Sequence, residues 1–200
     1  MKTGTGFFFC MLLLAVTGCN NQQKQMPEVK IAKTVTPYYI IATDSGFANH
    51  KDTVYYKNTF FTGFQYALFP TGDTEFVKSY FNGVEEGLQK KWYANRQLAE
   101  RRFYINGKKE GIQQGWWQDG KQKFIFEASN DMFVGEAREW NAAGMLYRDF
   151  HYVNGQEEGS QKMWWDNGSI RANYVIHNGK KYGLLGLKIC SNPYDSVSKK

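Results

Sequence analysis

The sequence has few of the residues that cross-link a chain, restrict its backbone or bind metals. Among its 200 residues are three cysteines, four prolines and three histidines. So few cysteines exclude a disulfide-stabilised scaffold, and the dispersed histidines form no cluster at metal-ligand spacing. Beyond the N-terminus there is no long helical periodicity. The chain is instead rich in aromatic residues (17%) and has 20 glycines, which favours many short strands joined by turns.

The first residues are typical of a secretion signal. Lys2 supplies a positive charge, and residues 7–16 form an apolar run that is too short to cross a bilayer as an ordinary helix. Residues 16–19 (VTGC) resemble the bacterial lipobox. The resemblance implies cleavage before Cys19, lipid attachment to its thiol and acylation of the new amino terminus, so that the membrane is a partner through a stable lipid anchor. The alternative is an ordinary secretion signal with an incidental cysteine.

Composition predicts the organisation of the rest of the chain. The expected divisions are a signal peptide (1–18), a flexible polar tether (19–37), a capping strand region (38–53), repeats (54–189) and a tail (190–200). Asn20, not Asp, follows Cys19; under the enterobacterial sorting rule, Asp there retains a lipoprotein at the inner membrane. We therefore expect a cell-envelope location with a lean toward the outer membrane. Export and scattered charges argue against nucleic acid as a partner.

A 24-residue period runs through the repeat region. Asparagine and, five residues later, glycine recur without a change of register: Asn58, Asn82, Asn106, Asn130, Asn154 and Asn178; Gly63, Gly87, Gly111, Gly135, Gly159 and Gly183. Within each unit, a strand of about six residues, a turn, and a strand of about eight residues lead to an Asn-Gly turn, whose residues tolerate the positive φ of type I′ hairpins. The sequence therefore predicts an all-β, elongated antiparallel meander of six 24-residue hairpins.

Alternation along the strands predicts which residues share a face. Counted from the unit glycine, positions +5, +11 and +17 have the same parity and are mostly apolar, so we expect one common face. Position +5 is tryptophan in four units and position +3 is polar or basic in the same units: Lys90, Trp92, Gln114, Trp116, Arg138, Trp140, Lys162 and Trp164. One interpretation is a stripe that binds an extended anionic or saccharide ligand. The favoured alternative is a tryptophan core with a solvated basic rim, because an exposed row of tryptophans promotes aggregation.

No set of residues indicates catalysis, a metal or a cofactor. His151 and His177 occupy different repeat positions and are expected at the surface. Cys190 beside His177 would lack a third residue to orient the imidazole. The pairs Glu85-Glu86 and Glu157-Glu158 lie next to turns, where solvated carboxylates are expected. We therefore predict a protein that is not an enzyme.

The repeat resembles the bacterial MORN-repeat variant family, in the group known as YwqK-type antitoxin proteins. The signature is an Asn-Gly turn, a glycine four residues later, an aromatic residue and an Asp/Asn-Gly turn; it is clearest in residues 106–120 and 154–168. The unit around Gly135 departs, with Asp131 and Asn141 at the glycine and aromatic positions. The resemblance implies a non-enzymatic scaffold that binds a protein or an envelope polymer. The alternative is an immunity-like protein that neutralises a toxin by direct binding, although a lipobox places it away from a cytoplasmic toxin.

Overall fold

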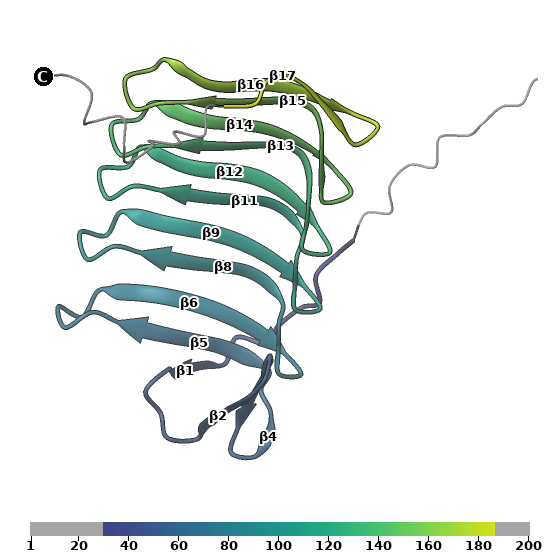
Figure 1. The fold of residues 1–200 in the computed structure, drawn as a ribbon. Coiled ribbons are helices and arrows are strands. Elements are labelled where there is room, and N and C mark those ends of the chain that lie inside the picture. Colours follow the sequence, from purple (N-terminus) through teal and green to yellow (C-terminus); the bar gives the residue numbers. More distant parts are fainter. Residues whose placement is uncertain (1–29, 187–200) are drawn as a thin grey trace, which may run out of the picture.

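The chain folds as a long sheet with a small sheet at one end (Figure 1). The computed structural model describes residues 30–186, which form 14-stranded and 3-stranded sheets. This part of the chain contains no helix that could cross a membrane. The predicted signal peptide, Cys19, the outer part of the predicted tether and Cys190 lie outside the described residues.

Five hairpins, one for each complete repeat, form the long sheet. Their strands are β5 (Gly63–Leu68) and β6 (Thr74–Phe81), β8 (Gly87–Trp92) and β9 (Leu98–Ile105), β11 (Gly111–Trp116) and β12 (Gln122–Ser129), β13 (Met132–Trp140) and β14 (Leu146–Val153), and β15 (Gln156–Trp164) and β16 (Ile170–His177). We number them hairpins one to five. Each pairs with the next, and β17 (Lys180–Leu184) opens the sixth repeat. Two short strands, β7 (Val84–Glu85) and β10 (Lys108–Lys109), continue the Asn-Gly turns. The predicted antiparallel meander of hairpins is confirmed.

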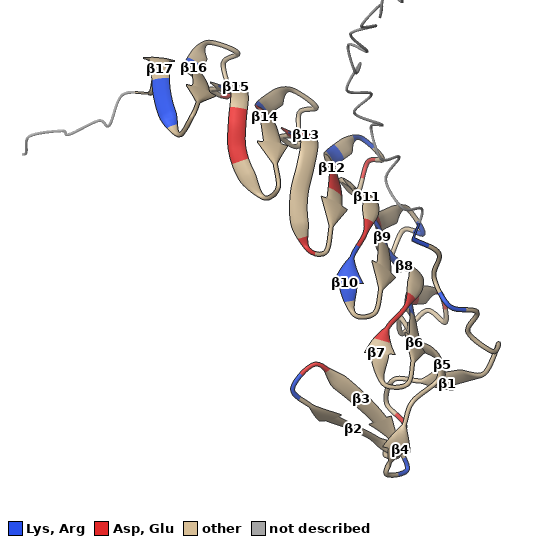
Figure 2. Ribbon diagram, turned by 90° about the vertical axis from the view of Figure 1, so that its right-hand side faces the viewer, with Lys and Arg blue, Asp and Glu red and all other residues tan. Residues whose placement is uncertain are grey.

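The N-terminal end departs from the meander. Strand β1 (Tyr39–Ile41) pairs with β5 in the parallel sense. The small sheet consists of β2 (Phe47–His50), β3 (Thr53–Tyr56) and β4 (Thr59–Phe60). Ile40, Phe61 and Tyr80 form a buried cluster between the small sheet and hairpin one. The small sheet bends toward one side of the long sheet, which we call the inner face (Figure 2).

Two kinds of turn close the hairpins. At the Asn-Gly turns both central residues have positive φ, as in Asn106 (51°) and Gly107 (78°), which is the type I′ geometry. Asn130-Asp131 keeps it without glycine, at 51° and 67°. At the opposite tips only one residue has positive φ. It is Gly72, Gly120, Gly144 or Gly168 in four hairpins and Arg96 in hairpin two.

A β-bulge in every hairpin corrects the predicted faces. Trp116 pairs with Gln122, but the preceding Gly115 pairs with Phe124, so Lys123 is an extra residue. The same shift occurs in the other four hairpins. Because one extra residue reverses the alternation, position +17 lies on the opposite face from +5 and +11. The expectation that these three positions share a face was wrong.

The buried residues lie mainly on the inner face. They include the +17 residues Tyr80, Tyr104, Ala128, Tyr152 and Ile176, together with Phe150, Ala172 and Tyr174. Burial and, secondly, the nearby Glu85 raise the pKa of Tyr104 to about 12. These tyrosines therefore stay neutral at physiological pH.

Residues 30–37 pack against the sheet on the side opposite the small sheet (Figure 2). The Lys33 amide donates to Glu86 Oε1 at 2.8 Å, and Lys30 Nζ donates to Glu110 Oε2 at 2.9 Å. This part of the predicted tether thus belongs to the folded edge. We call residues 30–37 the N-terminal strap.

Candidate functional site

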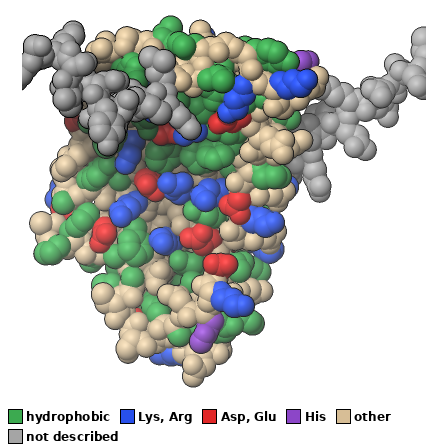
Figure 3. Space-filling model, viewed as in Figure 1, with side chains coloured by type: hydrophobic (Ala, Val, Ile, Leu, Met, Phe, Trp, Pro, Cys, Tyr) green, Lys and Arg blue, Asp and Glu red, His purple; other side chains and the backbone are tan. Residues whose placement is uncertain are grey.

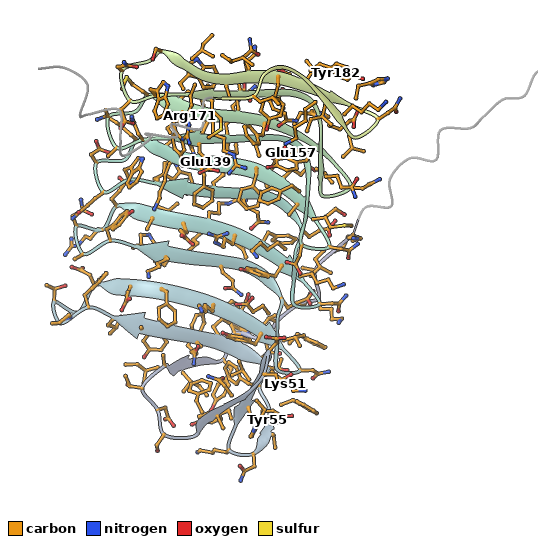
Figure 4. The ribbon with its side chains drawn as sticks, in the orientation of Figure 1. Lys51, Tyr55, Glu139, Glu157, Arg171 and Tyr182 are labelled. Atoms are coloured by element: carbon orange, nitrogen blue, oxygen red, sulfur yellow. The ribbon has the colours of Figure 1, made fainter. Side chains whose placement is uncertain are left out.

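The inner face brings side chains from every hairpin into continuous rows. One row is unbroken across ten strands: Ala67, Phe76, Lys91, Glu100, Gly115, Phe124, Glu139, Arg148, Met163 and Ala172. Apolar, acidic and basic side chains therefore alternate on an open surface (Figure 3). The labelled Glu139 lies over the upper hairpins, whereas Lys51 and Tyr55 mark the small sheet at the other end (Figure 4).

Cations lie over aromatic rings along this face. Arg148 is 4.2 Å from the centroid of Phe150, and Arg102 is 5.1 Å from that of Phe124. Lys78 and Lys181 lie 5.4 Å and 5.0 Å from rings at the two ends, Phe76 and Tyr174. Cation–π attraction holds these charges above the sheet. The inner face consequently presents positioned charges, because their stems and head groups cover the ring faces.

Arg148 is the most constrained of these cations. Its Nη1 donates to Glu139 Oε1 at 3.0 Å and its Nη2 donates to the Tyr152 hydroxyl at 3.1 Å. The Tyr147 hydroxyl also donates to Glu139. Burial and this hydrogen bond raise the pKa of Tyr147 to about 12. The result is a fixed ion pair on hairpin four.

Two of the hollows on the inner face lie beyond the small sheet. The first, of about 260 Å³, lies between hairpins one and two and is lined by Phe76, Lys78, Gln89, Lys91 and Arg102 among others. The second, of about 270 Å³, lies over hairpins three and four; its lining includes Phe124, Phe126, Phe133, Ala137 and Arg148. Arg102 borders both. An extended ligand could therefore contact both hollows through one shared arginine.

Buried glutamines at position +2 join successive hairpins. Gln113 is fully buried; its Oε1 accepts from the Phe103 amide at 3.2 Å and its Nε2 donates to the Phe103 carbonyl at 3.1 Å. Gln161 makes the same pair of bonds with His151. Each side chain takes the place of a backbone peptide group where the strand pairing shifts register beside the unit glycine. Glutamine at +2 in four units is the sequence signal for this role, but it does not by itself distinguish a structural amide from an exposed one.

Carboxylates before the unit glycines bind the type I′ turn that follows the hairpin they precede. Glu86 Oε2 accepts from the Asn106 amide at 2.7 Å, and Glu110 Oε2 accepts from the Asn130 amide at 3.0 Å. Glu86 is fully buried, so the expectation that it is a solvated turn residue was wrong. Its backbone hydrogen bonds from Lys33 and Asn106 satisfy the carboxylate inside the protein.

The predicted stripe lies on the other side of the sheet, the outer face. Its +3 residues are interleaved with +14 residues in one row: Ile41, Tyr66, Val77, Lys90, Arg101, Gln114, Ile125, Arg138, Asp149, Lys162, Asn173 and Leu184. Glu136 and Asp149 both form ion pairs with Arg138, at 2.7 Å and 3.1 Å. The basic residues are thus brought into one row, but the row is mixed in charge.

The tryptophan column is neither buried core nor fully exposed. Trp92, Trp116, Trp140 and Trp164 are all partly buried. At the adjacent +6 position, Tyr93 and Trp117 donate hydrogen bonds of 3.0 Å to the carbonyls of Trp116 and Trp140 in the next hairpin. Aromatic side chains at the hairpin tips therefore join neighbouring repeats by hydrogen bonds to backbone carbonyls. The sequence did not indicate these bonds.

The histidines do not form a metal centre. His151 Nδ1 lies 2.9 Å from the Glu158 carbonyl, and the exposed His177 lies 3.7 Å from the Glu158 carboxylate. Within residues 30–186, no group of three His, Cys, Asp or Glu could hold a metal ion. Cys190 lies outside the described residues, so its proximity to His177 is untested.

Comparison with known proteins identifies no family. No family model matches the chain, and no curated protein matches it significantly. The resemblance to MORN-type repeats therefore stays a prediction from the repeat residues.

Proposed function

We propose that this chain is a lipid-anchored, non-enzymatic repeat scaffold of the MORN type that binds a protein or another envelope component along its inner face. The observation that carries the proposal is the series of cations over aromatic rings on a sheet face that, among residues 30–186, no second layer covers beyond the small sheet at hairpin one. Positioned charges on a rigid surface recognise a partner without a large rearrangement of the scaffold. An extended partner with negative charges complements this face best.

A pull-down from the native envelope tests the binding face. In one variant, Arg102→Gln and Arg148→Gln remove two inner-face charges; in the matched control, Arg101→Gln and Lys162→Gln remove two from the outer face. We expect the inner-face variant to lose the captured partner and the control to retain it. Circular dichroism and urea unfolding check that both variants fold. Loss in the control alone would assign binding to the outer face, and failure of the wild type to capture a partner would contradict the proposal.

The anchor requires its own test, because Cys19 lies outside the described residues. Cells grown with radioactive palmitate should label the wild type, whereas Cys19→Ser should abolish labelling and release the protein from membranes. Cys10→Ser is a matched control within the predicted signal peptide and should have no effect. Unchanged labelling of Cys19→Ser would exclude the anchor.

A further inference from the structure

The hollow between hairpins one and two contains a compact group of hydrogen-bond donors. Phe76 pairs with Lys91, and Lys91 pairs with Glu100 across three neighbouring strands. Gln89 pairs with Arg102, and extending the β6–β8 register by one residue places Lys78 opposite Gln89. Opposite Cβ atoms are about 5 Å apart in such pairs. Gln89 is therefore flanked by Lys78 and Arg102, with Lys91 two residues farther along its own strand.

The charges around Gln89 are not fully compensated. Arg102 Nε donates to Glu100 at 2.8 Å, which leaves its Nη groups for another acceptor. Within residues 30–186, neither Lys78 nor Lys91 forms an ion pair. The other acidic residue lining the hollow is Glu75. Three cationic groups thus surround one glutamine in a hollow of about 260 Å³.

Gln89 differs from the other buried glutamines in having an unpaired amide. Gln113 Nε2 donates to the Glu110 carbonyl at 3.0 Å, and Gln161 Nε2 donates to the Glu158 carbonyl at 3.1 Å. The equivalent Glu86 carbonyl instead accepts from the Ser79 hydroxyl. Gln89 is 7% exposed, and among the described residues its Nε2 is the buried side-chain atom without a hydrogen-bond partner. A buried amide in that state favours a ligand that accepts its hydrogen bond.

We infer that this hollow is a binding site for a phosphate group, in which Lys78, Lys91, Arg102 and the Gln89 amide are the donors. A phosphate presents at least three acceptor oxygens, so it can use more of these donors than a carboxylate. The small sheet projects on the same side of the long sheet (Figure 2), which prevents a flat bilayer from reaching the hollow. The ligand is therefore a phosphate ester, free or on a flexible polymer. The inference deepens the proposed function by naming a ligand group for the same face.

Titration with inorganic phosphate, followed by ¹H–¹⁵N spectra of side-chain amides, tests the site directly. The sample is the full chain in maltoside micelles, which contain no phosphate. We expect a saturable shift of the Gln89 Nε2 resonances and none for Gln113 or Gln161. No saturable shift at Gln89, or equal shifts of all three amides, would overturn the inference.

A charge-matched pair of variants separates specific binding from general attraction. Lys78→Gln with Lys91→Gln should weaken phosphate binding at least about tenfold, since each removes a charge-assisted hydrogen bond. The control, Lys162→Gln with Lys180→Gln, loses the same charge far from the hollow and should retain wild-type affinity. Equal weakening in both would show a nonspecific charge effect and contradict the site. If the hollow variant fails to fold, Gln89→Leu provides the alternative and should also weaken binding.

Two further ligands distinguish the source of the phosphate. Glycerol 3-phosphate should produce the same Gln89 shift, whereas phosphatidylglycerol vesicles should not bind an unlipidated Cys19→Ser chain through Lys78 and Lys91. Vesicle binding that depends on those lysines would overturn the assignment to a soluble or polymeric ester. These titrations need no captured partner, so their failure is distinguishable from failure of the envelope pull-down.

Discussion

Hairpins two and three each have a buried glutamine at position +2, Gln89 and Gln113, but the two side chains make different contacts. In hairpin three, Gln113 spans the gap to hairpin two with bonds to both backbone groups of Phe103. For Gln89 of hairpin two, the residue equivalent to Phe103 is Ser79 of hairpin one, whose hydroxyl donates to the Glu86 carbonyl that the glutamine would otherwise use. The Ser79 hydroxyl thus accounts for the difference: the Gln113 amide is bonded within the protein, whereas the Gln89 amide has no partner there.

Hairpin four shows why the structural glutamine is needed elsewhere. It has Ala137 at position +2, and Glu127 on the preceding strand pairs directly with Val134. In hairpin five, by contrast, the pairing passes from Phe150 to Tyr152 and leaves His151 to Gln161. The glutamine therefore appears where the bulge leaves backbone groups without a strand partner.

The largest expected effect comes from deleting the structural glutamine. Gln113→Ala should lower the free energy of unfolding by about 1–3 kcal/mol, because it leaves the Phe103 N–H unpaired, whereas the Phe103 carbonyl keeps its bond from the Glu110 amide. Gln89→Ala should cost less than about 1 kcal/mol, since its amide makes no bond. Urea unfolding measures both, and Gln114→Ala on the outer face is a control expected within about 0.5 kcal/mol of wild type. Equal losses for Gln113 and Gln89 would contradict the distinction between them.

Glu110, the carboxylate before the unit glycine of hairpin three, provides the next test. Burial tends to raise the pKa of Glu110, but hydrogen bonds from Lys30 and the Asn130 amide outweigh it and lower the pKa below its usual 4.5. The stability due to Glu110 is therefore fully present above pH 4.5 and is lost as the pH falls through the lowered value. We expect about 1 kcal/mol less stability in Glu110→Gln at pH 7.

Urea unfolding between pH 7 and pH 3 measures this contribution. The gap between Glu110→Gln and wild type should close at the acidic end, together with loss of amide-exchange protection at Asn130. Glu127→Gln is an exposed control on the same hairpin and should show no such convergence. A gap that is unchanged at pH 3 would show that the Glu110 charge does not hold the turn.

The repeat architecture was predictable because its turn geometry restricts residue choice. Consecutive residues with positive φ require Asn, Asp or Gly at nearly every copy, so Asn106-Gly107 and Asn154-Gly155 mark hairpins directly. Alternation was a poorer guide to the faces. The residue at +12, such as Lys123, is an extra residue in a bulge that no particular side chain requires. Counting odd and even positions across this bulge therefore assigned position +17 to the wrong face of the sheet.

The candidate site was harder to predict than the fold. Lys90, Arg138 and Lys162 are conspicuous at a fixed spacing, yet the register places Arg101, Ile125 and Asp149 between them. The inner-face site uses positions whose residue type changes between repeats, such as +15, which is Lys78, Arg102 and Phe126 in successive units, so no periodic pattern reveals it. Likewise, the burial of Glu86 depends on the N-terminal strap, whose polar composition indicated only a tether.

Removing the hydroxyl should make hairpin two resemble hairpin three. In Ser79→Ala the Glu86 carbonyl becomes free, and the Gln89 amide can bond to it as Gln113 does to Glu110. We expect phosphate affinity to fall about threefold, roughly 0.7 kcal/mol. Phe103→Ser should in turn remove the hydrogen bond from the Gln113 amide to the Glu110 carbonyl, with Phe103→Ala as the control for the lost ring. Side-chain amide spectra report both changes, and an unshifted Gln89 amide in Ser79→Ala would contradict the role of the hydroxyl.

The tips of hairpins two and three are expected to show the smallest difference in stability. Arg96 has a φ of 66° at the position where hairpin three has Gly120, and a side chain in this region costs about 1 kcal/mol. Its exposed ion pair with Asp73, at 2.8 Å, offsets only part of that cost. Arg96→Gly should therefore raise the free energy of unfolding by about 0.5 kcal/mol, whereas Gly120→Arg should lower it by about 1 kcal/mol. Arg96→Gln retains the backbone strain but removes the ion pair, so urea unfolding of all three separates the two terms. A loss in Arg96→Gly larger than that in Arg96→Gln would show that the ion pair, and not the backbone, determines stability at this tip.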